Sequence, residues 1–572
     1  MVRVAIVDGY VDEPTVLGVP PYLSMYPRYI AGAIWKHDSH AEILYTTIDH
    51  VRRSFGHAIE KWSTCDLVIL VAGMIVPGKY IGGTPISVRE ARTLFSDPRL
   101  DSTTSILVGP WANFGCGLEG GKLAMSSEHL TPPITHVLPG DPEMVVAQIA
   151  SMNWSVEHVA TSDIQSATPA QINEYAVTGA RVALQHPNHQ RGYLIAEIET
   201  YRGCPRFITG GCSFCTEPLY GLPQQRPADD IANEIKALYE FGVRAFRIGK
   251  QADLFTYGSK EIGEEEFPTP NPLALEEMFS KIRVVAPDLD VLHIDNVNPG
   301  TIARHPERSE SVAKVIMKYH TEGDVAAFGA ESLDPEVIKR NNLKASPEEI
   351  LEAVRLLNEV GGERDLWGLP HLLPGINLLY GLPGESRRTI DHNMEFLKTL
   401  VDEGLIVRRI NIRQVIGFDD TRLGSAKTKL KRNLFFRHKE QVRQEIDTEM
   451  IKRVAPPGTI LRSLFIERQE GNSYLLRQLG TYPLLCHLPI GQEIADRRDV
   501  LVIDHGPRSL KVLPYPFRPN EASLAQWKAI PGIGAKRATR LKGIDSYTNI
   551  HELEQQLDSV LPEWIKHGID FS

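Results

Sequence analysis

Short apolar stretches alternate with helical stretches along most of the first 420 residues of this chain. In residues 1–160, strand-like runs at 2–7, 67–72 and 105–109 end near Gly or Asp, and residues between them have helical periodicity. Strand–helix alternation restricts a chain to parallel sheets covered by helices. The pattern therefore predicts an α/β fold, with a doubly wound, Rossmann-like domain over residues 1–160.

A second and longer series of the same kind covers residues 190–425. Helical stretches such as 229–241 and 346–360 separate six strand-like runs. These runs lie at 193–198, 245–249, 291–294, 325–330, 375–379 and 409–413. Six strand–helix units predict a partial (β/α)6 barrel, in which functional side chains gather at the carboxyl ends of the strands.

The C-terminal part has a different pattern. Residues 426–515 begin with a basic helical segment and continue as short strand-like runs with Gly and Pro between them, which predicts a small β-domain. Residues 516–572 are expected to form a short helical tail.

Composition narrows the class of protein. The 572 residues are 42% hydrophobic and 23% charged with a net charge of -10, so any nucleic-acid contact must come from a local basic patch. The N-terminus reads as a first strand and lacks the apolar core of a signal peptide. No apolar run is long enough to span a bilayer, and 6 cysteines do not make a disulfide scaffold. We therefore expect a cytoplasmic protein without a membrane partner.

Half of the cysteines, Cys204, Cys212 and Cys215, lie within one short run. Such clustering in a cysteine-poor chain predicts soft-metal ligation. Three thiolates are one ligand short of a closed zinc site, and the nearest histidines, His186 and His189, belong to the connector before the barrel. The run therefore favours an iron–sulfur cluster with one open iron, and structural zinc is the alternative.

The cysteine run resembles the motif of the radical S-adenosylmethionine (SAM) superfamily. It follows Tyr-Arg-Gly, has Phe214 before its last cysteine, and has the spacing C-x7-C-x2-C where the family usually has C-x3-C-x2-C. The additional residues include 207–211. The resemblance implies a [4Fe–4S] cluster on the three thiolates, SAM on the fourth iron, and an electron donor such as ferredoxin or flavodoxin. Reductive cleavage of SAM would then give a 5'-deoxyadenosyl radical.

Further matches to this superfamily fall at the ends of the expected strands. They include a weak match to the Gly-Gly-Glu-like turn after the second strand and a Gly-Leu-Pro-Gly-Glu turn after the fifth. For each match alone, an ordinary turn or helix cap is the competing interpretation. The residues that the resemblance implies in SAM binding are Phe214, Gly249, Lys250, Gln251, Glu331, Ser332, Gly381, Gly384 and Arg413.

Two branches of the superfamily fit the N-terminal region. Residues 18–34 resemble the Pro-rich turn and first helix of cobalamin-binding domains, and residues 108–115 are glycine-rich, but the Asp-x-His-x-x-Gly signature is absent. Whether the chain binds cobalamin therefore stays open. The domain order also resembles methylthiotransferases, which carry three more N-terminal cysteines. Here only Cys65 and Cys116 precede the triplet, so one cluster is expected and not two.

Two basic segments indicate that the chain contacts nucleic acid. Residues 529–542 resemble a helix-hairpin-helix motif, whose glycines expose backbone amides to a phosphate at the start of a helix. A second basic segment carries interleaved phenylalanines that can stack on bases. A protein-interaction hairpin and a solvated basic helix are the alternatives. The residues expected to contact nucleic acid are Gly532, Gly534, Lys536, Arg537, Arg540, Lys431 and Arg432.

The sequence leaves three functional hypotheses. The first is a radical SAM enzyme that modifies a nucleic acid, with tRNA favoured, by methylation or methylthiolation at an unactivated carbon. The second is a cobalamin-dependent radical SAM methyltransferase of a small molecule or protein. The third is a non-enzymatic nucleic-acid binder with a structural cluster.

Overall fold

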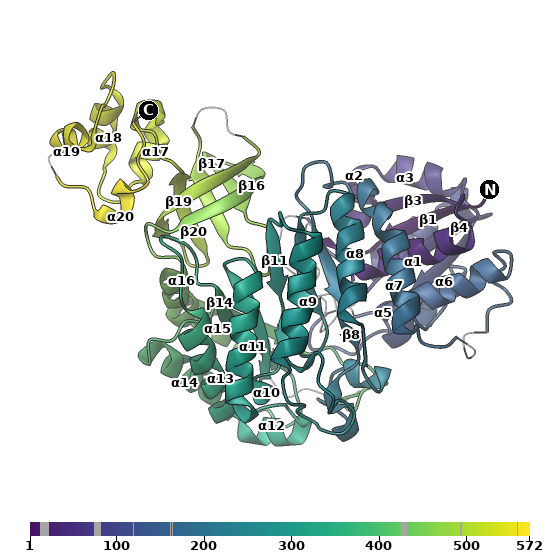
Figure 1. Ribbon diagram of the computed structural model, residues 1–572. Coiled ribbons are helices and arrows are strands. Elements are labelled where there is room, and N and C mark those ends of the chain that lie inside the picture. Colours follow the sequence, from purple (N-terminus) through teal and green to yellow (C-terminus); the bar gives the residue numbers. More distant parts are fainter. Residues whose placement is uncertain are drawn as a thin grey trace.

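The protein consists of two α/β units, a small β-barrel and a helical C-terminal module (Figure 1). The computed structural model describes residues 1–11, 22–73, 82–117, 119–160, 162, 164–424, 432–491, 495–557 and 559–571. Its two α/β units are built on parallel sheets, which confirms the predicted α/β class. Within the described part of the chain, no helix is long and apolar enough to cross a membrane.

The N-terminal unit is a five-stranded parallel sheet in the order β3-β1-β4-β5-β6. The chain order reverses between β1 and β4, so this is the switch point at which doubly wound sheets bind ligands, beside the carboxyl ends of the strands. Successive side chains of β1 face different cores, because Val4 packs with one helical layer and Ala5 with the other. The strands are β1 (Arg3–Asp8), β3 (Glu42–Thr47), β4 (Leu67–Val71), β5 (Thr104–Val108) and β6 (His136–Val137).

Two glycines set how closely the helices cover this sheet. Helix α1 (Met25–His37) crosses α7 (Pro169–Gly179), and both contain a glycine at the contact. A Cβ on Gly32 would lie 1.9 Å from the Tyr175 carbonyl oxygen, and one on Gly179 would lie 1.8 Å from the Arg28 carbonyl oxygen. The backbones therefore touch at a distance that only glycine permits.

The second unit is a partial barrel of two four-stranded sheets, β2-β7-β10-β11 and β12-β13-β14-β15. Each of the six expected runs forms a strand, and a short further strand, β12, follows the third run after Asp295. All neighbours within these sheets are parallel. The strands are β2 (Tyr22–Leu23), β7 (Ile195–Glu199), β10 (Ala245–Lys250), β11 (Val291–Ile294), β12 (Asn296–Val297), β13 (Asp324–Glu331), β14 (Leu372–Tyr380) and β15 (Arg409–Gln414).

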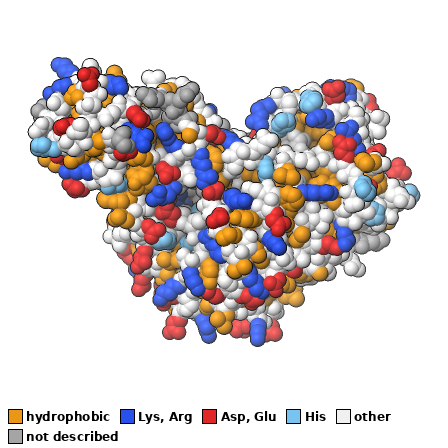
Figure 2. Space-filling model, turned by 45° about the horizontal axis from the view of Figure 1, so that its top comes forward, with side chains coloured by type: hydrophobic (Ala, Val, Ile, Leu, Met, Phe, Trp, Pro, Cys, Tyr) orange, Lys and Arg blue, Asp and Glu red, His pale blue; other side chains and the backbone are white. Residues whose placement is uncertain are grey.

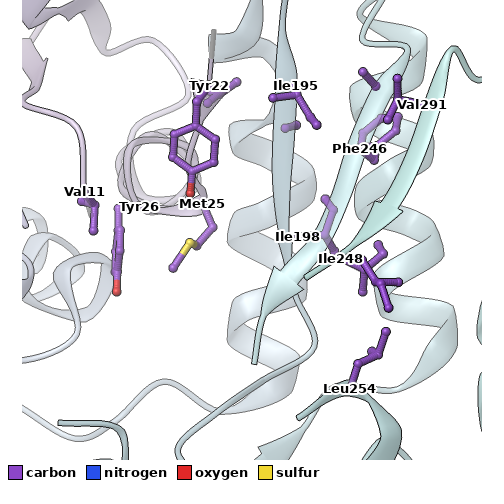
Figure 3. Close-up of a cluster of buried hydrophobic side chains, with 14 of the residues drawn as sticks. Val11, Tyr22, Met25, Tyr26, Ile195, Ile198, Phe246, Ile248, Leu254 and Val291 are labelled. Atoms are coloured by element: carbon purple, nitrogen blue, oxygen red, sulfur yellow. The ribbon is translucent and has the colours of Figure 1, made fainter. Parts of the chain in front are cut away.

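The two α/β units share one hydrophobic core. Strand β2 comes from the N-terminal region, yet Tyr22 and Leu23 pair with Ile195 and Ala196 of β7. Figure 3 shows Tyr22 and other buried side chains of this N-terminal segment beside those of the first barrel strands. The N-terminal unit is therefore packed onto the barrel edge through a continuous apolar contact.

The β-barrel and the helical module sit at the amino-terminal end of the barrel strands, opposite α10 (Pro299–Arg304) and α12 (Pro335–Asn341) (Figure 1). Helices α15 (Arg432–Val442) and α16 (Thr448–Val454) lead into five strands that close in the order β16-β17-β18-β20-β19. These strands are β16 (Ile460–Glu470), β17 (Ser473–Arg477), β18 (Leu485–Pro489), β19 (Arg497–His505) and β20 (Ser509–Pro514). The module contains α17 (Leu524–Ala529), α18 (Ala535–Lys542), α19 (Ile550–Leu557) and α20 (Glu563–Lys566).

A loop between β17 and β18 inserts into this end of the partial barrel. Thr481 donates its backbone N–H to His293 Nδ1 at 3.0 Å and its hydroxyl to the Ile294 carbonyl at 2.9 Å. Tyr482, with φ +57°, packs on Val325 and Ala327 of β13. The small β-barrel therefore closes the end of the partial barrel opposite the carboxyl ends of its strands.

Candidate active site

The three clustered cysteines line one cavity at the carboxyl ends of the barrel strands. The cavity has a volume of about 760 Å³, including space open to solvent. It is lined by residues of the segments after β7, β10 and β12, by residues of β12, β13 and β14 themselves, and by Lys344 after α12. Active sites of parallel α/β barrels form at this end. The polar residues that line it are Cys204, Arg206, Cys212, Cys215, Glu217, Asp253, Thr256, Glu266, Asn296, Asn298, Thr301, Glu331, Lys344 and Asn377.

The three thiols share this cavity without meeting at one point. Among the described residues, no three Cys, His, Asp or Glu side chains are close enough to hold a single metal ion. A zinc site requires ligands that converge on one ion, whereas each cysteine of a [4Fe–4S] cluster binds a different iron. The donor set therefore fits a cluster with one free corner better than it fits a zinc ion.

Local hydrogen bonds fold the cysteine segment. The Cys215 N–H donates to the Cys212 carbonyl at 3.2 Å, so the two-residue spacing forms a turn. Asn341 holds the middle of this turn, because the Ser213 N–H donates to its carbonyl at 2.9 Å and the Ser213 hydroxyl to its side-chain oxygen at 2.7 Å. The fourth barrel strand, through the helix that follows it, thus positions the turn between two cysteines.

Two cations lie beside the thiols. Burial raises the pKa of the Cys204 thiol to about 12, although Arg206 and Lys344 lower it. Burial also raises the pKa of Cys215 well above its ordinary value. Burial thus favours the protonated forms of Cys204 and Cys215, and cluster binding must release their protons. Arg206 and Lys344 favour the thiolate forms that a cluster requires.

Glu331 reaches the cavity from a strained position at the end of β13. Its backbone has φ +62°, and the pairing of β13 with β14 shifts between Gly329 and Glu331. Burial raises the pKa of its carboxyl group, while Lys344, at 4.0 Å, and Arg413 lower it. Strain of this kind concentrates at functional sites. Ser332 does not line the cavity, because its hydroxyl accepts the Asp334 N–H at 3.2 Å before α12.

The Gly249-Lys250-Gln251 turn contacts residues around the cavity. Lys250 forms a buried ion pair with Glu217 at 2.9 Å, and Gln251 accepts the Thr200 hydroxyl at 3.1 Å. A Cβ on Gly249 would lie 2.2 Å from a Glu197 carboxylate oxygen. None of the three lines the cavity, whereas Asp253, two residues further on, does.

The turn that contains Gly381 and Gly384 also contacts a residue of the cavity wall. Both glycines have positive φ, at +99° and +95°, and the Glu385 carboxylate accepts the Gly381 N–H at 2.7 Å. The turn places Leu382 in an apolar cluster with Phe214, which does line the cavity. Arg413 lies on β15 and acts electrostatically on Glu331 and Asp295, yet it is not a lining residue.

The sequence motifs missed Lys344, Asp253 and the amide residues Asn296, Asn298 and Asn377. Lys344 follows α12, far along the chain from the cysteines, and a single lysine there carries no sequence signal. Asp253 and Asn298 follow the ends of β10 and β12, which is the one signal that points to them, whereas Asn296 lies on β12 and Asn377 lies within β14. The Thr301 hydroxyl donates to Asp253 at 2.7 Å, and burial raises the pKa of Asp253 to about 6.

The carboxyl edge of the N-terminal sheet lies beside that end of the barrel. In the loop that follows α5 (Pro110–Phe114), Gly121 donates its N–H to the Val415 carbonyl at 2.6 Å, just beyond β15. The Phe114 ring contacts Tyr220, whose segment follows the cysteines, with centroids 5.9 Å apart. Among the described residues, the buried Trp111 indole N–H at this edge has no hydrogen-bond partner. A ligand on this sheet would therefore sit close to the cysteine cavity.

A buried ion cluster joins the N-terminal unit to the cysteine segment. Arg202, two residues before Cys204, contacts Asp141 at 2.9 Å, Glu143 at 2.7 Å and Glu199 at 2.7 Å. Burial raises the pKa of Glu143 to about 7, and Arg202 opposes that shift. A proton on Glu143 reduces the excess of negative charge around the single guanidinium.

The hairpin before α18 is exposed. Gly532 has φ +85°, and no atom of the described residues lies within 4 Å of a Cβ added to Gly532 or Gly534. Lys536, Arg537 and Arg540 are exposed as well. Figure 2 shows a hollow between this module and the N-terminal unit, with basic and acidic side chains mixed around it.

The hairpin and the cysteine cavity lie at opposite ends of the barrel strands (Figure 1). Of the second basic segment, Lys431 lies outside the described residues. Arg432 forms an ion pair with Glu119 at 3.2 Å and lies 5.6 Å from the Phe436 ring centroid. The expected nucleic-acid residues are therefore not brought together at the cavity.

Comparison with known proteins places the chain in a family. The model of the radical SAM superfamily matches residues 198–397. The chain is 46% identical over 520 residues to the uncharacterized protein MJ0274 of Methanocaldococcus jannaschii, which covers 89% of this chain and 92% of the other. It is 40% identical over 535 residues to an uncharacterized protein of Archaeoglobus fulgidus, at 93% of each chain. The chain belongs to the family of these proteins and carries a radical SAM domain.

Two more distant matches are enzymes whose names state the reaction that they catalyse. The chain is 26% identical over 209 residues to the ribosomal protein uS12 methylthiotransferase RimO of Parabacteroides distasonis, covering 36% of this chain and 41% of the other. The solved structure of the radical SAM methyltransferase TsrM from Kitasatospora setae covers 74% of this chain and 75% of its own, with 16% identity and a TM-score of 0.47. The radical SAM domain makes the chain an enzyme whose cofactors are a [4Fe–4S] cluster and SAM, and such enzymes need an electron donor.

Proposed function

We propose that this chain is a radical SAM methyltransferase whose cluster is held by Cys204, Cys212 and Cys215. One observation carries the proposal: the three thiols, Glu331 and Lys344 line the same cavity at the carboxyl ends of the barrel strands. When bound, the cluster supplies the electron that cleaves a carbon–sulfur bond of SAM.

The other lining groups suit the polar parts of SAM. The Lys344 ammonium complements a carboxylate, and the Glu331 carboxylate complements an ammonium group or ribose hydroxyls. The amides of Asn296, Asn298 and Asn377 provide donors and acceptors for a heterocycle or a sugar. Phe214 contributes an apolar wall. The site thus offers charges of both signs to a zwitterionic ligand.

The N-terminal sheet supports cobalamin as a second cofactor. Its switch point between β1 and β4 is where such sheets bind a ligand, and this edge lies beside the cysteine cavity. Among the described residues directly after β1, β4 and β5, none is a histidine. We therefore propose a corrin bound without an axial histidine from these loops.

The other cysteines favour methyl transfer over methylthiolation. Cys65 and Cys116 are both buried in the core of the N-terminal unit, and burial raises their pKa values to about 11 and about 12. Cys486 is buried in the small β-barrel. Cys65 and Cys116 share the N-terminal core while Cys486 lies in the β-barrel core, so these cysteines do not supply three ligands to a second cluster.

Anaerobic reconstitution of the full chain tests this proposal. We expect about four irons per chain, an electron paramagnetic resonance signal that changes when SAM is added, and retained cobalamin. Cys212→Ala should lose the iron, whereas Cys116→Ala should keep it, because Cys116 lies in the N-terminal core. Wild-type protein without iron would refute the radical SAM site. Iron without bound corrin would refute the cobalamin component alone.

A second candidate function is modification of a nucleic acid, with tRNA as the substrate. The exposed hairpin supports it, because the glycines and the basic side chains at the start of α18 are exposed and fit a phosphate. Since the hairpin lies at the far end of the barrel, such a substrate must extend along the molecule to reach the cavity.

Salt-dependent binding to tRNA tests this candidate. Lys536→Ala with Arg537→Ala should weaken binding and reduce the salt dependence, because each lost phosphate contact lowers the slope by about 0.9. Lys528→Ala, on α17 of the same module, is the matched control. Unchanged tRNA binding in the double variant, or an unchanged tRNA nucleoside profile in cells lacking the gene, would contradict this function.

A further inference from the structure

The long spacing between Cys204 and Cys212 forms an ordered turn. Residues Pro205–Thr209 form one 3-10 turn, and the N–H groups of Gly210 and Gly211 donate back to Phe207 and Arg206, both at 2.9 Å. Both glycines have positive φ, at +77° and +61°. A Cβ on Gly211 would lie 2.3 Å from the Pro218 ring, so glycine is required there.

Side chains from distant segments hold this turn. The Asn342 amide donates to the carbonyls of Gly211 at 2.9 Å and Thr209 at 3.3 Å. The Arg422 guanidinium also donates to the Gly211 carbonyl. A loop held by residues from two other parts of the barrel has a fixed conformation, which indicates that its shape serves the site.

The turn delivers one guanidinium to a cysteine. Arg206 Nη1 donates to Cys212 Sγ at 3.2 Å, while its other nitrogens donate to Glu266 at 2.7 Å and to the Asn342 carbonyl at 2.9 Å. Arg206 is only 3% exposed. Each of the three guanidinium nitrogens of Arg206 donates a hydrogen bond, so the position of Arg206 relative to the Cys212 sulfur is fixed.

We propose that Arg206 is a positioning residue that raises the reduction potential of the iron–sulfur cluster, and that the long cysteine spacing exists to place it. This inference depends on the assignment of Cys212 as a cluster ligand. Reduction transfers one electron to the cluster and breaks no bond. The added negative charge lies partly on the ligand sulfurs, so a buried cationic donor stabilises the reduced state more than the oxidised state. Hydrogen bonds to sulfur and net charge are the protein's means of setting this potential.

The glutamate partner of Arg206 gives a prediction of opposite sign. Glu266 places a carboxylate on the same guanidinium and also lines the cavity. Removing its negative charge leaves the positive field of Arg206 less compensated at Cys212. Glu266→Gln should therefore make the cluster easier to reduce, whereas Arg206→Gln should make it harder.

The test is a redox titration of the anaerobically reconstituted full-length protein with dithionite, followed by electron paramagnetic resonance. For Arg206→Gln we expect about a tenfold smaller equilibrium constant for reduction, a fall of about 59 mV for a one-electron couple. Glu266→Gln should shift the midpoint upward. Arg422→Gln is the matched control, because it also releases the turn but touches no cysteine, and its midpoint should equal the wild-type value.

Several outcomes would overturn the inference. An Arg206→Gln midpoint equal to that of the wild type at equal iron content is one, and an equal downward shift in Arg422→Gln is another. If Arg206→Gln does not retain iron, the midpoints of Arg206→Lys and Glu266→Gln test the inference instead. The lysine keeps the positive charge, so Arg206→Lys should shift the midpoint less than the loss of that charge would. A downward shift in Glu266→Gln would then refute it. A wild-type protein without iron would refute the cluster assignment itself, which is a different result.

Discussion

Lys250 and Glu217 form an ion pair of 2.9 Å that is removed from solvent and joins the end of β10 to the segment just after Cys215. The Gly203 N–H donates to the other carboxylate oxygen of Glu217 at 3.3 Å. One carboxylate thus connects the two sides of the cysteine run to the second barrel strand. Lys250 acts on the site through this link and not by lining the cavity.

Removing the cation of this pair should destabilise the protein strongly. Lys250→Met leaves the buried Glu217 carboxylate without its cationic partner, so we expect a loss of about 3–5 kcal/mol in the free energy of unfolding. Lys250→Met with Glu217→Gln should recover most of that loss, because no buried charge then remains. Urea unfolding measures both. A Lys250→Met variant as stable as the wild type would show that the pair does not matter for folding.

Lys344 should contribute to SAM affinity. Hydrogen bonds to charged groups contribute about 1.5–3 kcal/mol, so Lys344→Met should raise the Kd for SAM on the order of 10–100-fold. Lys339→Met changes an exposed lysine on α12 and should leave the Kd unchanged. Anaerobic equilibrium dialysis of reconstituted protein provides the measurement. An unaltered Kd in Lys344→Met at full iron content would rule out this role.

Stability should fall as the pH rises towards 7 because of Glu143. Its pKa is about 7 in the folded protein and about 4.5 in the unfolded chain, so between these values the folded state holds the extra proton. Rising pH therefore favours unfolding in that window, by roughly 3 kcal/mol for this group, and has no further effect above it. Denaturant midpoints at pH 5 and pH 8 should differ less in Glu143→Gln than in the wild type. The same pH dependence in both proteins would exclude Glu143 as the cause.

The contact of Tyr482 with β13 should matter for the stability of the whole chain. Replacing a large buried aromatic side chain with alanine costs about 3–5 kcal/mol, so Tyr482→Ala should lower the unfolding free energy by this amount. Tyr482→Phe keeps the ring and should lose far less. Thermal unfolding followed by circular dichroism compares them. If both variants unfold like the wild type, the loop does not hold the two barrels together.

The sequence predicts those parts of the fold that local patterns determine. All six barrel strands follow from apolar runs, and the cysteine spacing identifies the site because three thiols in one segment must lie near one another. The resemblance to the superfamily also implies Glu331 in SAM binding, and Glu331 lines the cavity.

The remaining features depend on side-chain direction and on distant segments. Lys250 and Gln251 follow the second strand as expected, but their side chains turn to Glu217 and Thr200 and not to the cavity. Lys344 enters from a loop after α12, and no local pattern marks it. The role of Arg206 requires the positions of Glu266 and Asn342, which only the folded chain brings together.

The pairing of β2 with β7 also has a consequence for synthesis on the ribosome. Tyr22 and Leu23 must wait for Ile195 and Ala196 to be translated before they can form this edge of the partial barrel. Until then the apolar side chains with which this segment packs on the first barrel strands remain uncovered. The first α/β unit therefore cannot finish folding as the nascent chain emerges, and the order of translation exposes this segment to chaperones before the catalytic half exists.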